Sequence, residues 1–145
     1  SFFFFISILN ISGKPGLYKL ISYGKNLVIV ESFVDKKRFP VHSRDKIISL
    51  GDVAIYTTGD DKPLSAVLES AIAKYPQGVD ASAYKTDEQL HELMTSILPD
   101  YDEERVYKTD IKKLISWFNT LVKAGYTTFV KKEEEKNEET ESAEK

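Results

Sequence analysis

The chain has 145 residues, of which 41% are hydrophobic and 30% are charged, and its formal net charge is −3. This composition is typical of a water-soluble protein with enough chain for one or two small domains. It contains no cysteine, which excludes disulfide bonds, thiolate nucleophiles and cysteine-ligated zinc or iron–sulfur clusters.

Charge is distributed unevenly along the sequence. Residues 1–57 contain eight Lys or Arg against four Asp or Glu, residues 58–130 contain eight against twelve, and residues 131–145 contain four against seven. The first part is therefore basic and the remainder acidic. A basic part favours anionic partners such as nucleic acid.

The chain begins with an apolar run over residues 1–9 that includes four consecutive phenylalanines. It is far shorter than the roughly 20 residues that span a bilayer, and it lacks the basic region and small-residue cleavage site of a signal peptide. We expect no membrane span and a segment packed on the core, with Ile6, Ile8, Leu9 and Ile11 buried. The remnant of a clipped signal or anchor is the alternative.

The next stretch predicts a β-hairpin. A turn at residues 13–16 leads into a β-rich run at 17–23, and the residues Gly24-Lys25-Asn26 separate it from a second run at 27–34. Two such runs with glycine in a short gap are typical of a hairpin. We expect Gly16 to need a positive φ, whereas nothing in the sequence requires one at Gly13.

Three further short runs follow, at residues 38–42, 46–50 and 53–57, each separated from the next by turn residues. Pro40 has no N–H to donate, so the first of these runs should lie at an edge or a bulge. Five short strands in close succession favour a closed sheet, because closure leaves little edge exposed. The sequence therefore predicts a small SH3-like β-barrel over residues 1–58.

The hydrophobic period changes to that of helices after residue 58. Apolar stripes predict helices at residues 64–75, at 87–98 with a capping box at Thr86, and at 111–124 with a cap at Thr109-Asp110 and Gly125 at its end. Residues 131–145 contain no large apolar side chain and should be disordered. The expected fold class is α+β: a small SH3-like β-barrel, a three-helix region at 59–130 and a disordered acidic tail.

Three short motifs fail at the residue that decides them. The Gly-Lys pair at 13–14 is not followed by the Ser or Thr of a phosphate-binding loop. The helix with His91 carries Thr95 where a second zinc ligand would stand. The acidic run from Asp100 has Arg105 where a calcium loop needs glycine. We expect no metal, no cofactor and no catalytic residue, and hence a non-enzymatic binding protein.

Two kinds of ligand remain open, on the barrel or in the groove between barrel and helices. Basic residues interleaved with aromatic ones favour binding of RNA or another single strand, and the candidate residues are Lys19, Lys25, Lys36, Lys37, Arg38, Tyr23 and Phe39. The alternative is a protein partner that docks on exposed aromatic residues of the helical part, namely Tyr101, Tyr107 and Trp117. Strand aromatics are also common in cores and turn lysines are commonly solvated, so each set has a purely structural interpretation.

Three blocks, at residues 11–22, 31–40 and 98–119, together resemble a family of uncharacterised small bacterial proteins described as a domain of unknown function. The similarity spans residues 8–125, and the phenylalanine-rich start departs from the polar opening usual in that family. The resemblance implies a cytoplasmic protein with a β-rich N-terminal part, a helical C-terminal part and a charged, variable tail. It implies no activity and no site residues.

Overall fold

The computed structural model describes residues 5, 7–42 and 44–129. The predicted burial of Ile6 and the predicted disorder of residues 131–145 therefore fall outside the described residues. The elements in chain order are β1 (Ile8–Ile11), β2 (Tyr18–Gly24), β3 (Leu27–Ser32), β4 (Arg38–His42), β5 (Ile47–Ser49), the 3₁₀ turn η1 (Leu50–Asp52), β6 (Ala54–Ile55), β7 (Lys62–Pro63), α2 (Leu64–Lys74), the 3₁₀ turn η2 (Ala81–Ala83), α3 (Asp87–Ile97) and α4 (Lys108–Lys123).

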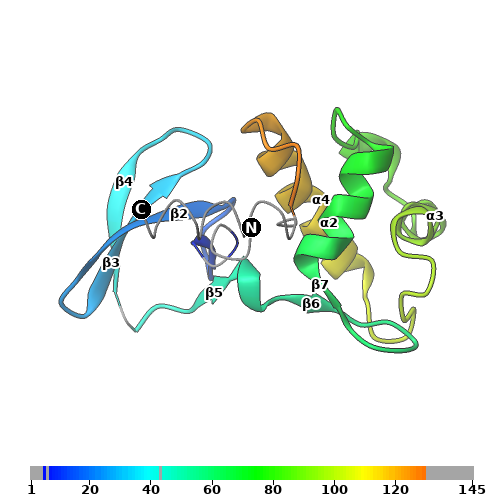
Figure 1. Cartoon of the computed structure of the whole chain (residues 1–145), viewed down its shortest axis with the longest axis horizontal. Helices are drawn as coiled ribbons and strands as arrows, with labels where there is room; N and C mark the ends of the chain where they lie inside the picture. The colour runs from blue at the N-terminus through cyan, green and yellow to red at the C-terminus, as the bar shows by residue number, and fades with distance from the viewer. Residues whose placement is uncertain (1–4, 6, 43, 130–145) are drawn as a thin grey trace, which may run out of the picture.

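Five of these strands form one antiparallel sheet in the order β4-β3-β2-β1-β5. The sheet lies at one end of the molecule and α3 at the other, with α4 and α2 between them (Figure 1). The apolar N-terminal segment supplies β1, in which Leu9 lies opposite both Tyr18 and Ser49. The expected burial of Ile8, Leu9 and Ile11 is confirmed, but the segment is a central strand and not merely a stretch packed against the core.

The predicted hairpin is confirmed and consists of β2 and β3. Gly24 pairs with Leu27, so Lys25 and Asn26 form the two-residue turn, with Asn26 at φ 59°. Short polar asparagine tolerates this left-handed conformation better than most residues. Pro40 lies in β4, an edge strand, which confirms the position expected for a residue with no N–H.

The predicted SH3-like barrel is wrong, because the sheet is open and β4 and β5 form its two edges. A sheet closes into a barrel only when its two edge strands pair with each other. After β5 the 3₁₀ turn η1 redirects the chain, and the residues predicted as the last strand form β6, which pairs with β7 instead. The β6–β7 pair leads directly into α2, since the Leu64 N–H donates to the Val53 carbonyl at 2.9 Å.

The sheet buries apolar residues on both faces, because successive strand residues point to opposite sides. On one face Leu9, Ile11, Tyr18, Val30 and Val41 form a small cluster of their own. On the other face the larger core joins the sheet to all three helices, and its sheet-side and N-terminal members are Phe5, Ile8, Leu17 and Leu50. The predicted division of the chain at residues 58 and 59 stays a prediction.

The helical part follows the apolar stripes closely. Thr86 and Gln89 form the predicted capping box of α3, and Gly125 follows α4 at φ 98° as its predicted C-cap. The predicted cap at Thr109-Asp110 is wrong, since α4 begins at Lys108. Asp110 lies in the first turn, and its carboxylate accepts a hydrogen bond from the Tyr107 N–H at 2.9 Å. In the described ranges no helix is long and apolar enough to cross a membrane.

Candidate ligand-binding groove

A continuous groove follows the junction between the sheet and α4. Two adjoining hollows share the same four residues, Asn10, Ile48, Lys113 and Trp117. Asn10 and Ile48 lie opposite each other on β1 and β5, while Lys113 and Trp117 lie one helical turn apart on α4. We call the two hollows together the interface groove, with a basic end and an apolar end.

The basic end has a volume of about 560 Å³ and is lined by the 11–16 loop, β5 and α4. No acidic side chain among the described residues lines it, and its four lysines are Lys14, Lys46, Lys112 and Lys113. The Lys14 ammonium lies over the Phe39 ring, on the sheet face away from the helices, so the charges directed at the hollow are those of the other three lysines. All four are exposed, and none forms an ion pair within the described part of the chain. A hollow lined by charges of one sign raises the local concentration of oppositely charged ligands.

The apolar end has a volume of about 250 Å³. Its lining is mainly hydrophobic and comes from β5, the segment around β6, α4 and the loop before α4: Ile48, Val53, Ala54, Ile55, Tyr56, Val106, Leu114 and Trp117. Ile48 is 50% exposed, so part of this apolar surface faces solvent. The polar groups at this end are few and belong to Asn10, Arg105, Asp110 and Lys113.

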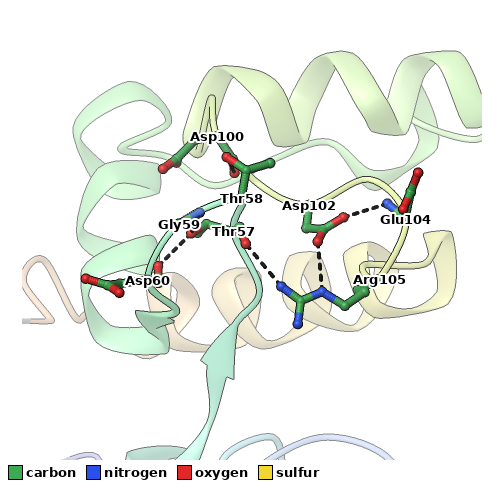
Figure 2. Close-up of polar contacts among 8 residues, drawn as sticks. All are labelled: Thr57, Thr58, Gly59, Asp60, Asp100, Asp102, Glu104 and Arg105. Carbon is green, nitrogen blue, oxygen red and sulfur yellow. Dashed lines mark hydrogen bonds and ion pairs between the residues drawn. The ribbon is translucent and has the colours of Figure 1, made fainter.

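Arg105 lies at the outer wall of the apolar end and is held by three contacts. Its Nε donates to the Asp102 carboxylate at 2.8 Å, and its terminal nitrogen donates to the Thr57 carbonyl at 3.2 Å (Figure 2). Its guanidinium also lies 4.3 Å from the centre of the Tyr56 ring. The hydrogen bond from Arg105 lowers the pKa of Asp102, so the pair is charged at neutral pH.

The same wall ties the residues after β6 to the connection between α3 and α4. The buried Thr57 hydroxyl donates to the Asp60 carbonyl at 2.6 Å and accepts from the Gly59 N–H at 3.0 Å. The Thr58 N–H donates to the Asp100 carbonyl at 2.9 Å. Figure 2 shows these residues converging on one another from two separate segments. Because its polar groups are mutually satisfied, the wall is preformed.

The predicted nucleic-acid-binding residues are spread over the hairpin strands and are not gathered at one site. Lys19 and Arg38 both lie opposite Glu31, and Arg38 donates to the Glu31 carboxylate at 2.9 Å. Lys36 and Lys37 lie at the β3–β4 turn. Lys25 and Tyr23 lie near the other end of β3. A strand of this length is roughly 20 Å long, so the two groups are separated by about that distance.

The two predicted stacking residues differ in their surroundings. Tyr23 is 78% exposed. Phe39 is half-buried. Its ring and that of Tyr18 form a T-shaped pair with centroids 5.4 Å apart, and the Lys14 ammonium lies 5.0 Å from the Phe39 ring centre. The role predicted for these residues stays a prediction, but neighbouring side chains already cover much of the Phe39 ring.

The exposure predicted for two of the partner-binding aromatics is wrong. Tyr101 and Trp117 are only 6% and 9% exposed, whereas Tyr107 is 64% exposed. Tyr101 lies in an isolated β-bridge with Thr57, and its hydroxyl lies 2.7 Å from His91 Nδ1. Sequence reasoning missed this because the surrounding residues are acidic and irregular, and the bridge joins segments far apart in the chain.

The residues of the interface groove were not predicted as a set. Lys112 and Lys113 occupy the polar side of a clearly amphipathic helix, where lysines are ordinarily solvated. Lys14 lies in the turn after β1, Lys46 lies directly before β5, and Asn10 lies in a strand that was not predicted. The only signal for the site was Asn10 itself, a polar residue within an apolar run.

The fold and the groove define a two-part α+β protein whose described residues contain no group of three metal-ligating side chains. Residues 6–50 match a family model described as "Domain of unknown function (DUF5606)", and residues 53–121 match one described as "Domain of unknown function (DUF6852)". The interface groove takes Asn10 and Ile48 from the first matched segment and Lys113 and Trp117 from the second.

A solved relative has the same two-part arrangement over nearly its whole length. It is a solution NMR structure from Bacteroides vulgatus, determined as a structural-genomics target, with 50% sequence identity and a TM-score of 0.70. The similarity covers 87% of this chain and 91% of that one, and a search of curated proteins found no match. The chain therefore belongs to the same family of two-part proteins of unknown function, which confirms the resemblance seen in the sequence.

Proposed function

We propose that this chain is a non-enzymatic binding protein that holds a nucleic acid in the interface groove. The observation that carries the proposal is the convergence of Lys46, Lys112 and Lys113 on a hollow with no acidic side chain among the described residues. Lysine ammonium groups bind phosphate as point charges. Three of them along one groove suit a chain of phosphates better than a single small anion.

The groove replaces the sheet surface as the favoured site. On the sheet, Arg38 is already paired with Glu31, and the cations at the two ends of β3 cannot contact the same short ligand. The protein-partner alternative now depends on Tyr107, since Tyr101 and Trp117 are buried. The two ligand classes differ in salt dependence, because phosphate contacts weaken steeply with salt and apolar docking does not.

The test is a titration of a labelled single-stranded RNA by fluorescence anisotropy at 50 and 200 mM salt. Three phosphate contacts on a single strand give a log–log slope of about −2, so affinity should fall roughly 20-fold over this range. The double variant Lys112→Glu/Lys113→Glu should lower affinity at least tenfold. The matched variant Lys36→Glu/Lys37→Glu, at the β3–β4 turn, makes the same charge change outside the groove and should have little effect.

Two results would contradict the proposal. Absence of binding at low salt would remove nucleic acid as the ligand. A large loss for the turn variant, with none for the groove variant, would place the site on the sheet as the sequence alone predicted.

A further inference from the structure

We propose that the apolar end of the interface groove takes an unpaired nucleobase, that Asn10 hydrogen-bonds its polar edge, and that the protein therefore prefers single strands to duplexes. This inference rests on the proposed function, because it assumes that the lysines of the basic end contact phosphate. It adds the part of the ligand that the lysines do not explain.

The two ends of the groove form one site. Asn10, Ile48, Lys113 and Trp117 line both hollows, so a ligand at the lysines lies directly beside the apolar end. A single strand has the matching arrangement, with charged phosphates along its backbone and bases that have apolar faces and polar edges.

The apolar end is not an ordinary packing defect. A hollow inside the helical core, lined by Leu68, Val79, Met94 and other apolar residues, has a volume of about 10 Å³, against about 250 Å³ for the apolar end. The larger hollow opens between the sheet and α4 beside the half-exposed Ile48. Flat apolar groups gain free energy by leaving water for such a surface.

Asn10 is the polar group best placed to recognise a base. It lies two residues after the fully buried Ile8 and therefore on the same face of β1, the face that points toward the helices. Its side-chain amide has both a donor and an acceptor, and it forms no hydrogen bond within the described ranges. An amide with both functions can pair with the edge of a base.

Of the other polar groups at this end, Lys113 is assigned to phosphate at the basic end, and Arg105 and Asp110 are already engaged. Arg105 is held by Asp102 and the Thr57 carbonyl, and Asp110 accepts from the Tyr107 N–H. Asn10 therefore differs from them in having its hydrogen-bonding capacity unused by the described residues. A base that reaches Asn10 must be unstacked and unpaired, which a duplex does not offer without first being opened.

The experiment compares three ligands of roughly 12 nucleotides, a length within the usual range of single-strand sites. They are a single-stranded RNA, the same strand with abasic positions, and the corresponding duplex. The single strand should bind about tenfold more tightly than either of the others, because only it offers unpaired bases for stacking and edge contacts. This comparison uses the unaltered protein and so does not depend on any variant folding.

A variant then tests Asn10 itself. Asn10→Leu should lower affinity for the intact strand about fivefold and leave affinity for the abasic strand unchanged. Lys112→Glu/Lys113→Glu should lower the affinity for all three ligands to a similar extent. A merely structural role of Asn10 would weaken binding of the abasic strand as well.

The outcomes separate the two proposals. Equal affinity for intact and abasic strands, or tighter binding of the duplex, would overturn the base site and leave phosphate binding in place. Absence of binding to any of the three would overturn both. A further outcome is that the protein binds none of the RNA ligands and yet binds, in a salt-sensitive way, an acidic peptide with an apolar side chain. That result would assign the groove to a protein partner instead.

Discussion

Single residues decide the turn that leads from β1 into β2. Gly13 and Gly16 have φ values of 82° and 84°, in the left-handed region that glycine adopts without steric strain. The positive φ expected at Gly16 is confirmed, and the expectation that Gly13 needs none is wrong. Both residues line the basic end of the groove, so this turn also shapes that end.

We expect Gly13→Ala and Gly16→Ala each to lower the free energy of unfolding by about 1–2 kcal/mol through backbone strain. A Cβ at Gly13 would meet no atom within 4 Å, so its effect would come from φ alone. Gly59→Ala is the matched control, because no positive φ occurs there and the nearest atom is 3.9 Å away. Urea unfolding measures all three, and equal losses at the three positions would contradict this account.

At the scale of elements, hydrogen bonds between distant segments fix the helices relative to one another. Asn119 of α4 accepts from the Val79 N–H at 2.8 Å and donates to the Val79 carbonyl at 2.7 Å. Both backbone groups of a buried residue are thereby satisfied by a single amide. This contact connects the segment before η2 to the helix that forms one side of the groove.

Asn119→Ala should therefore lower the free energy of unfolding by about 1–3 kcal/mol, because it leaves a buried donor and acceptor unpaired. Thr120→Ala is a suitable control on the same helix, since the Thr120 hydroxyl only donates to the Ser116 carbonyl of its own helix at 2.8 Å. The control should change stability by less than about 0.5 kcal/mol. A loss no larger for Asn119 than for Thr120 in chemical denaturation would show that the contact is dispensable.

At the scale of the whole molecule, the larger core is completed by residues from both ends of the described chain. Phe5 and Phe129 are fully buried, with ring centroids 6.1 Å apart, and Phe129 also lies 6.3 Å from Phe118. The Phe129 N–H donates to the Glu69 carboxylate at 2.6 Å. The core therefore extends to Phe129, just before the acidic segment begins.

Truncation after Val130 should leave the melting temperature within a few degrees, because residues 131–145 carry no large apolar side chain to bury. Truncation after Thr128 removes Phe129 as well, and should lower the free energy of unfolding by about 3–5 kcal/mol, as loss of a core phenylalanine does.

The truncation after Val130 should also tighten RNA binding, because it removes seven glutamates against four lysines. Thermal unfolding and the RNA titration check the two effects, and a large loss of stability for the first truncation would contradict the account.

The sequence by itself determined the features that depend on near neighbours. The β2–β3 hairpin, the edge position of Pro40, the capping box of α3 and the apolar stripes of all three helices were predictable, because each follows from residues a few positions apart. The start of α4 was missed by three residues, since Asp110 acts from within the first turn and not as the cap.

Only the tertiary structure decided whether the sheet closes and where a ligand can bind. Strand order depends on pairing between distant segments. Strand β5 pairs with β1, as Leu9 with Ser49 shows, and not with β4, so the sheet is open where the sequence predicted a barrel. The groove likewise joins Asn10 to Lys113 and Trp117, more than a hundred residues later. Local propensity carries no information about such contacts, because they form only when the core brings the sheet and α4 together.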